Sequence, residues 1–420
     1  MGQKEADYKW KTVGLKKSTF EYFEGHMFNE FVQDHSKWPK ASLRIEKYSL
    51  LYQNSFNRYV TVAIAITLVH MNIMLQIFRM FSYLFLLLLY NKVSVALDCG
   101  QSSSGALRVA YTITVDKSGK GNFTTIQSAI DHVPVDNSRW IRVQISPGVY
   151  REKVIIEEHK PCILLDGAGN RFTSVEWNDH EDTRQSATFT SLAANIVAKG
   201  ITFKNTYNGP FSLDKTQLTQ AVAAEILGDK SAFHECAFYG VQDTLWDATG
   251  RHFFHQCYIQ GGVDFIFGNG QSLYEKSTIK YSLGAYATQY SSGYITAQGR
   301  ESANDPGGFV FSNCQINGSS KAYLGRAWKS YSRVIIANSY LSEIVVPVGW
   351  DAWNLKGKEA QITYVEENCR GPGSDTSKRV PWMKKLSATE LSQFLDASFI
   401  DQEGWLSGVA KLLDVESFFG

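Results

Sequence analysis

Short runs of aromatic and aliphatic residues, each ending on a small residue, recur through the second half of the chain. They are AFHEC ending at Cys236, HFFHQC at Cys257, SLYEKS at Ser277, FVFSNC at Cys314 and VIIANS at Ser339, with intervals of 21, 20, 37 and 25 residues. Stacked coils of a parallel β-helix produce such a period, because one coil alone cannot bury its inward face. The pattern predicts an all-β solenoid. The longest interval predicts one coil plus an excursion loop around residues 281–306.

Two aspartates share one phase of this repeat. Asp243 lies in Val-Gln-Asp-Thr-Leu, and Asp264 follows 21 residues later in Gly-Val-Asp-Phe-Ile-Phe-Gly. Residues at matching phase on adjacent coils lie about 4.8 Å apart, so the pattern places two carboxylates side by side. Gln220 and Gln242 form a second column, one residue earlier in each coil.

Acidic residues of a solenoid are usually solvated turn residues, but these two lie in apolar, strand-like runs beside the glutamine column. Two carboxyl groups that are close and partly buried do not both ionise readily, so the pKa of one rises while the other stays low. Such a split is typical of a pair in which one group is an acid and the other a nucleophile.

From about Thr112 to Leu406 the chain resembles the plant pectinesterases, or pectin methylesterases. The resemblance rests on ordered motifs: TITVDKSGKGNFTTIQSAI at 112–130, GVYRE at 148–152, GITFKNT at 200–206, QAVA at 220–223, GVQDTLWD at 240–247, GVDFIFG at 262–268 and YLGRAW at 323–328. It implies a single-stranded right-handed parallel β-helix and a carboxylic ester hydrolase that demethylesterifies homogalacturonan pectin, releases methanol and modifies the cell wall.

The resemblance also implies residue roles. Asp264 is expected to be the nucleophile and Asp243 the acid that protonates methanol and then activates water. Gln242 and Gln220 are expected to donate hydrogen bonds to the oxyanion. The other expected site residues are Arg326, which pairs with Asp264 and also contacts substrate, Trp328, a platform for a sugar ring, and Thr183, a weaker candidate for substrate contact. No metal and no cofactor is expected.

Two positions depart from the pattern. Ala327 replaces the proline of Leu-Gly-Arg-Pro-Trp, which loosens the link between Arg326 and Trp328. Restoring proline there is therefore expected to improve catalysis modestly. Ser277 falls where the column of Cys236 and Cys257 would continue.

Other chemistries fit the sequence less well. It has no Gly-x-Ser-x-Gly elbow, no Gly-x-x-x-x-Gly-Lys phosphate loop, no Cys-x-x-Cys pair and no His-x-x-x-His pattern. Two alternatives stay open: a β-helix that binds pectin without turning it over, and a calcium-dependent pectate lyase. Release of methanol without calcium and without unsaturated products separates these three functions.

Composition adds limits. A chain of 420 residues with 44% hydrophobic content can bury one large solenoid core. A net charge of +1 gives no indication of nucleic-acid binding. The expected partners are pectin and, as the resemblance implies, a proteinaceous pectinesterase inhibitor, and the enzyme is expected to be a monomer.

The first hundred residues form a separate problem. Residues 71–97 resemble a secretory signal, with Arg79 before an apolar stretch from Met80 to Tyr90 and Ser94-Val95-Ala96 as cleavage site. Residues 1–70 then form a disordered or non-native extension, and residues 98–420 form the catalytic domain without an inhibitor-like pro-region. The alternative is an uncleaved signal anchor preceded by a net charge of +3, the one arrangement that involves a membrane. Both interpretations place the enzyme outside the cytosol, in the plant cell wall.

Three further features concern the mature chain. Cys236, Cys257 and Cys314 are interpreted as small buried hydrophobic residues stacked in the coils rather than a disulfide framework. Sequons at Asn122 and Asn317 are candidate glycosylation sites. Ser387-Ala-Thr-Glu390 predicts a capping box that begins a helix through about Phe399, and residues 407–420 predict another short helix. These helices are expected to cover an end or a side of the solenoid.

Overall fold

The computed structural model describes residues 71, 74, 76, 99, 108–180, 182–209 and 218–418. The chain divides into two compact units, Met1–Val95 and Ala96–Gly420. The predicted extension 1–70 and the predicted cleavage site lie outside the described residues, and so the domain boundaries stay predictions. Within the described part of the chain, no helix is long and apolar enough to cross a membrane.

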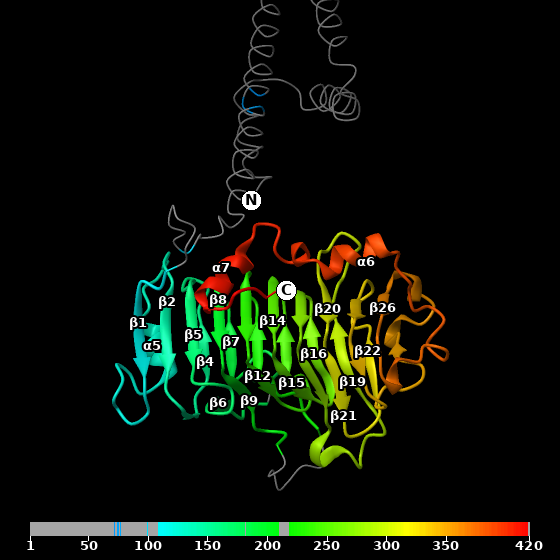
Figure 1. The fold of residues 1–420 in the computed structure, drawn as a ribbon, viewed down its shortest axis with the longest axis horizontal. Coiled ribbons are helices and arrows are strands. Elements are labelled where there is room, and N and C mark those ends of the chain that lie inside the picture. The colour runs from blue at the N-terminus through cyan, green and yellow to red at the C-terminus, as the bar shows by residue number, and fades with distance from the viewer. Residues whose placement is uncertain are drawn as a thin grey trace, which may run out of the picture. The chain divides into compact units, whose positions relative to one another are not determined.

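Three parallel sheets run along the second unit and form the predicted β-helix (Figure 1). Sheet A contains β1 (Tyr111–Val115), β2 (Ile141–Ile145), β5 (Ile163–Gly167), β8 (Ile196–Lys199), β11 (Ser231–His234), β14 (Arg251–His255), β17 (Gln271–Glu275), β20 (Gly308–Ser312), β23 (Arg333–Ala337) and β26 (Thr363–Glu367). Sheet B contains β3 (Gly148–Tyr150), β6 (Thr173–Trp177), β9 (Thr202–Asn205), β12 (Ala237–Tyr239), β15 (Tyr258–Gly261), β18 (Thr278–Tyr281), β21 (Gln315–Gly318) and β24 (Tyr340–Leu341). Sheet C contains β4 (Val154–Ile156), β7 (Phe189–Ser191), β10 (Ala224–Ile226), β13 (Leu245–Asp247), β16 (Val263–Gly268), β19 (Gly293–Gln298), β22 (Ala322–Arg326) and β25 (Trp350–Asp351).

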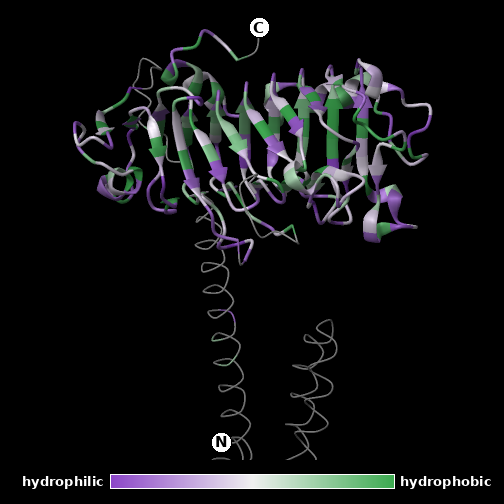
Figure 2. Ribbon diagram, turned by 90° about the horizontal axis from the view of Figure 1, so that it is seen from below, coloured by the Kyte–Doolittle hydropathy of each residue, from purple (hydrophilic) through white to green (hydrophobic). Residues whose placement is uncertain are grey.

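The apolar runs of the sequence are strands of sheet A. They are nearly continuous in hydrophobicity because both faces of this sheet are buried. The inward face carries an aromatic ladder in which Phe254 stacks on Phe233 at 5.1 Å and on Tyr274 at 4.6 Å between ring centroids. The outward face carries Phe253, Leu273 and their equivalents on other coils. Figure 2 shows hydrophobic residues repeated from strand to strand.

From β8 onward, one residue per coil turns the chain from sheet A toward sheet B. Each such residue has a positive φ, and the set is Gly200, Glu235, Gln256, Lys276, Asn313, Asn338 and Asn368. The left-handed conformation costs roughly 1–2 kcal/mol for a residue with a Cβ. The first corner is a glycine and avoids this cost, whereas at the other corners the stacking of the coils must offset it. The small residue that closes each run, such as Cys236 or Cys257, lies directly after the corner, and the strand of sheet B begins at the next residue.

The cysteine column is confirmed as a stack of small buried side chains. Cys236, Cys257 and Cys314 are free and buried. Ser277 continues the column, and its Oγ accepts a hydrogen bond from the backbone N–H of Cys257 at 3.0 Å. A hydroxyl at this position therefore satisfies a buried donor of the neighbouring coil.

One disulfide was not predicted from the sequence. Cys99 and Cys162 are bonded, with a sequence separation of 63. The bond ties the segment before β1 to the coil that contains β5.

The predicted excursion around residues 281–306 is partly wrong. The segment contains a 3-10 helix, η2 (Gly284–Tyr286), and then β19, a strand of sheet C. The sequence pattern missed β19 because Gly-Tyr-Ile-Thr-Ala-Gln lacks the long apolar run of a sheet A strand.

Helices cover the start and one side of the solenoid. α5 (Ile126–His132) buries Ile126, Ala129 and Ile130 against the first coils. The predicted capping box is present, since Ser387 accepts from the N–H of Glu390 and the Glu390 carboxylate accepts from the N–H of Ser387.

That capping box begins α6 (Ala388–Leu395), which ends before Phe399, because Asp396 is extended and caps the 3-10 helix η6 (Ala397–Phe399). α7 (Trp405–Leu412) follows, a little earlier than predicted. The other 3-10 helices among the described residues are η3 (Trp353–Leu355), η4 (Glu359–Gln361) and η5 (Pro372–Ser374).

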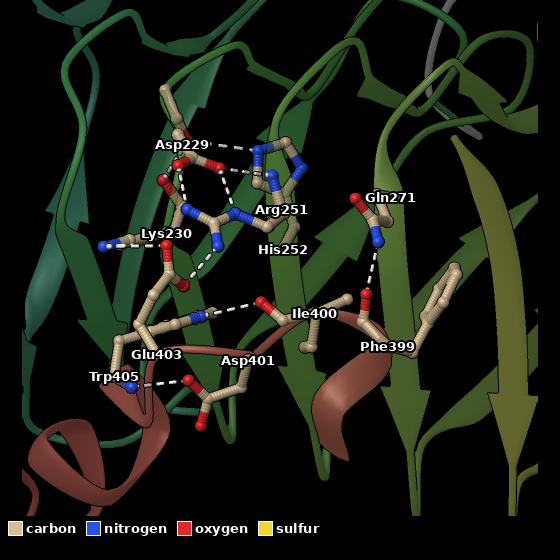
Figure 3. A network of polar contacts seen from close by, with 12 residues as sticks. Asp229, Lys230, Arg251, His252, Gln271, Phe399, Ile400, Asp401, Glu403 and Trp405 are labelled. Atoms are coloured by element: carbon tan, nitrogen blue, oxygen red, sulfur yellow. Dashed lines mark hydrogen bonds and ion pairs between the residues drawn. The ribbon is translucent and has the colours of Figure 1, made fainter. Parts of the chain in front are cut away.

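The C-terminal segment, residues 386–418, packs on the outward face of sheet A. Polar contacts fix it there as well (Figure 3). Arg251 pairs with Asp229 of the solenoid and with Glu403 of the segment, both at 2.5 Å. The side chain of Gln271 donates to the carbonyl of Phe399. The segment therefore covers a side of the solenoid.

Candidate active site

The two aspartates lie side by side on adjacent coils, as predicted. Asp243 lies in the turn between β12 and β13, and its backbone N–H donates to the carbonyl of Val263 at 3.0 Å. Asp264 is the second residue of β16. Both residues are buried, with relative exposures of 5% and 8% for the whole residue.

Both aspartates have left-handed backbone conformations, with φ of 59° at Asp243 and 48° at Asp264. The pairing of β16 with β19 shifts register between Val263 and Ile266, next to Asp264. A bulge of this kind re-aims a side chain relative to regular strand geometry. Aspartate tolerates this conformation better than most residues, which fits its use at both positions.

Arg326 forms a bidentate ion pair with Asp264. From the end of β22, its Nε donates to Oδ1 at 2.8 Å and its Nη2 donates to Oδ2. Its guanidinium carbon lies 3.7 Å from the ring centroid of Trp353 and 4.4 Å from that of Tyr294. The predicted pairing of Arg326 with Asp264 is therefore present in the structure.

The two carboxyl groups differ electrostatically. Burial and the charge of Asp264 raise the pKa of Asp243 to about 8, against the opposing effects of Gln220 and Arg326. Burial also raises the pKa of Asp264, but the hydrogen bonds and the positive charge of Arg326 oppose that rise. Near neutral pH this arrangement keeps the proton on Asp243 and the negative charge on Asp264.

The glutamine column lies beside this pair. The backbone N–H of Ala221 donates to the carbonyl of Gln242 at 3.2 Å, and Gln242 pairs with Val263 on the next coil. Gln220 is exposed and Gln242 is partly buried. The structure thus brings Gln220 and Gln242 to the same edge as Asp243 and Asp264.

Trp328 and Thr183 lie in different environments. Trp328 is 40% exposed, and its ring meets Phe267 edge to face at 6.1 Å. Phe267 in turn stacks on Trp246 at 5.3 Å, and these two residues follow Asp264 and Asp243 by three positions in the chain. Thr183 is partly exposed and accepts a hydrogen bond from Ser186 through its carbonyl. Among the described residues, Thr183 has no hydrogen bond to either aspartate, so its role stays a prediction.

Ala327 follows Arg326 in the chain. It is buried, and its backbone N–H donates to the carbonyl of Asp351 at 3.1 Å. A proline has no N–H and would lose this bond. We expected proline to improve catalysis because alanine would loosen the link between Arg326 and Trp328. In the structure, the hydrogen bond to Asp351 of β25 already holds the backbone at Ala327.

Sequence reasoning missed three residues around Arg326: Tyr294, Asp351 and Trp353. They come from β19, β25 and η3, which belong to none of the seven motifs. The signal available for two of them was the run Gly-Trp-Asp-Ala-Trp at 349–353, whose two tryptophans flank an acid. Across the part of the chain that the structure describes, no group of histidine, cysteine and acidic side chains could hold a metal ion.

A family model described as Pectinesterase matches residues 112–403. The chain belongs to the pectinesterase family. It is 53% identical over 298 residues to "Probable pectinesterase 55" of Arabidopsis thaliana, covering 70% of this chain and 90% of that protein. It is 52% identical to "Probable pectinesterase 29" of the same plant, covering 70% of this chain and 88% of the relative.

A solved structure supports the same conclusion for this pectinesterase. "Pectin methylesterase from Carrot" aligns with a TM-score of 0.65 and 31% sequence identity, covering 71% of this chain and 95% of that chain. The predicted parallel β-helix and the predicted carboxylic ester hydrolase class are therefore confirmed.

Proposed function

We propose that this pectinesterase hydrolyses the methyl esters of homogalacturonan, with Asp264 as nucleophile and Asp243 as acid and then base. The observation that carries the proposal is the unequal pair of buried carboxyl groups. Arg326 makes a bidentate pair with Asp264, while burial and the charge of Asp264 raise the pKa of Asp243 to about 8. Each group is thus held in the protonation state that its role requires.

The first half of the reaction forms an acyl-enzyme. An Oδ of Asp264 attacks the ester carbonyl carbon, and a tetrahedral oxyanion results. As this intermediate collapses, the bond to the methoxy oxygen breaks and Asp243 gives its proton to that oxygen. Methanol leaves, and an anhydride joins the galacturonate carboxyl group to Asp264.

The second half regenerates the enzyme. Asp243, now a carboxylate, takes a proton from water as the water oxygen attacks the anhydride carbonyl. Collapse releases the carboxylate of Asp264 and the galacturonic acid, which then loses the second proton of the water to solvent. Asp243 ends protonated, as it began, so the cycle needs no metal or cofactor.

Gln242 and Gln220 are the proposed oxyanion donors. The support for this role is that their backbone contacts align them one residue before the aspartate column. One oxyanion donor typically contributes ~10²- to 10³-fold to the rate. Gln242→Ala is expected to lower kcat by this amount while folding and pectin binding persist.

Substrate binding is proposed to use the exposed face of Trp328, since a flat indole suits the face of a pyranose ring. Arg326 and Gln220 are proposed to contact the chain near the ester, and Thr183 to contact it further along. We expect a monomer that acts on pectin in the plant cell wall and that a proteinaceous inhibitor can bind. The Cys99–Cys162 disulfide supports an oxidising compartment outside the cytosol.

The decisive experiment is methanol release from highly methylated pectin by the wild type and by Asp264→Asn. Loss of the nucleophile is expected to abolish turnover, and Asp243→Asn is expected to lower it by ~10²- to 10⁴-fold. Asp136→Asn is the matched control, because Asp136 is an exposed aspartate that also has a positive φ, of 54°. Circular dichroism reports folding. A folded Asp264→Asn enzyme with near-wild-type activity would overturn the mechanism and reopen the binding-protein and lyase alternatives.

A further inference from the structure

Arg326 is held by more than its ion pair. The guanidinium group contacts the ring of Tyr294 from β19 and the ring of Trp353 from η3, at 4.4 and 3.7 Å from its central carbon. A guanidinium group packed against aromatic rings gains cation–π and stacking energy. Because an arginine side chain has several rotatable bonds, such contacts select one orientation of the group.

Asp351 joins both rings to the strand of Arg326. Its Oδ2 accepts a hydrogen bond from the Tyr294 hydroxyl at 3.1 Å, and its Oδ1 accepts one from the backbone N–H of Trp353 at 2.8 Å. Asp351 also lies opposite Arg326 in the pairing of β22 with β25. One carboxylate thus fixes the two rings relative to the arginine.

Trp353 has an unusual backbone. Its φ is +52°, the left-handed region that bulky side chains rarely occupy. A residue kept in this region must be held there by its surroundings, and such residues gather at functional sites. At Trp353 the hydrogen bond from its N–H to Asp351 and the contact of its ring with Arg326 provide that support.

We propose that Tyr294, Trp353 and Asp351 form a clamp that positions Arg326 for its bidentate pairing with Asp264. The clamp residues are positioning residues: they act through Arg326. The inference rests on the proposed function, because it takes Asp264 as the nucleophile that Arg326 keeps ionised and aimed.

The clamp has a consequence for pH dependence. If Arg326 moves, the carboxylate of Asp264 loses hydrogen bonds to its charged form, and a higher pH is needed to ionise it. The other titratable groups that interact with Arg326, Asp264 or Tyr294 are Asp243 on the preceding coil, Tyr323, Asp351 and Tyr364. Of these, Asp243 is the group proposed to exchange a proton with the substrate.

The test measures kcat and KM for methanol release as a function of pH in Trp353→Ala, Trp353→Phe and Tyr294→Phe. Trp353→Ala is expected to move the acidic limb of the kcat profile upward by about 1 pH unit, equivalent to about tenfold lower kcat on that limb. KM is expected to change less than about threefold, because the clamp acts on ionisation rather than on substrate binding. Trp353→Phe, which keeps a ring, is expected to recover most of the loss.

Tyr294→Phe keeps the ring and removes only the bond to Asp351, so it tests the clamp even if Trp353→Ala does not fold. It is expected to move the limb in the same direction by less than about half a pH unit. Tyr323→Phe is the matched control, because Tyr323 stacks on Tyr294 at 5.0 Å and its hydroxyl has no hydrogen bond among the described residues. It is expected to leave the profile unchanged.

Two results would overturn the clamp. One is a higher KM with an unmoved acidic limb in both Trp353 variants, which would make Trp353 a sugar contact. The other is an unmoved limb in both Tyr294→Phe and Trp353→Ala. Either result leaves the proposed function standing if Asp264→Asn is inactive, whereas an active and folded Asp264→Asn enzyme removes the proposed function itself.

Discussion

Two bidentate arginine–aspartate pairs in this molecule differ in the direction in which the pKa of the aspartate is shifted. Arg326 pairs with Asp264 in the active site, and Arg251 pairs with Asp229 where the C-terminal segment docks on sheet A (Figure 3). In both pairs, Nε and a terminal guanidinium nitrogen donate to the two oxygens of one carboxylate. The pKa of Asp229 is nevertheless lowered, whereas that of Asp264 is raised.

Burial and one extra hydrogen bond account for the difference. Burial raises the pKa of both carboxyl groups, but the Asp229 side chain is 41% exposed and the Asp264 side chain only 11%. Asp229 also accepts a hydrogen bond from the backbone N–H of Arg251 at 2.9 Å. The docking pair is therefore a stabilising contact, while the active-site pair keeps a carboxylate in an unfavourable environment where it can react.

The largest expected effect concerns the active-site pair. Arg326→Ala leaves Asp264 buried without its cation, so less of it is ionised near neutral pH and kcat is expected to fall by about 10²- to 10³-fold. Methanol release measures this, with circular dichroism to check folding. A folded Arg326→Ala enzyme with more than about a tenth of wild-type kcat would show that Arg326 does not maintain the nucleophile.

The buried carboxyl group of Asp243 is expected to change the free energy of unfolding with pH. Its pKa is raised from the usual value to about 8, so the folded state holds this proton more tightly than the unfolded state. Stability from this group is present at low pH and is lost as pH rises from about 4 through about 8. Asp243→Asn is therefore expected to raise the free energy of unfolding by about 2–5 kcal/mol at pH 9 and to have little effect at pH 4.

Urea unfolding at the two pH values measures this difference. Asp136→Asn is again the control, because Asp136 is exposed. Equal effects of Asp243→Asn at both pH values would show that Asp243 does not carry the buried proton.

The pair of Arg251 with Asp229, where the C-terminal segment docks, is expected to stabilise the fold without affecting catalysis. Arg251→Ala removes contacts to both Asp229 and Glu403, and the free energy of unfolding is expected to fall by about 1–3 kcal/mol, between the values for surface and buried pairs. Arg142→Ala is the control, since Arg142 and Asp166 are 3.5 Å apart and both partly exposed, and it is expected to cost less than about 1 kcal/mol. The kcat of folded Arg251→Ala is expected to match the wild type; a large loss of kcat would link the docking pair to the active site.

The smallest effect is expected at Ala327. Ala327→Pro loses the hydrogen bond from its N–H to Asp351 but restricts the unfolded chain, and these two effects oppose each other. A net loss of stability within about 1 kcal/mol is expected, with kcat within about twofold of wild type. Thermal unfolding and methanol release check this. A clear gain in both would mean that the backbone at this position adapts to proline.

The repeat in the sequence predicted the fold and the aspartate column, because both follow from the spacing of residues along the chain. Once one face of each coil is buried, a shift of one residue would reverse every side chain, so the register of Asp243 and Asp264 was fixed by their apolar neighbours. The strands of sheet C that flank them, such as β10 and β13, are only three residues long. They have too few residues to show a period, and Asp243, expected within a strand-like run, lies in the turn before β13.

The surroundings of Arg326 could not be predicted in the same way. Tyr294 and Trp353 lie 32 and 27 residues from Arg326 in the chain, and the excursion before β19 breaks the spacing that relates one coil to the next. The Cys99–Cys162 disulfide is similarly remote in sequence. Contacts between segments that fall outside the regular spacing depend on tertiary folding rather than on the repeat, which is why they appeared only in the structure.

The docked C-terminal segment changes how this solenoid can unfold. In a simple repeat array each coil contacts only its neighbours, so stability is a sum of local contributions and single coils can fray. Here Lys199 of β8 donates to the carbonyl of Leu413, while Arg333 of β23 lies 5.2 Å from the ring of Phe394. One continuous segment thus contacts coils that are far apart along the axis. Opening a coil beneath it also strains contacts made to distant coils, so the solenoid is expected to unfold in fewer and larger cooperative steps than its repeat alone would allow.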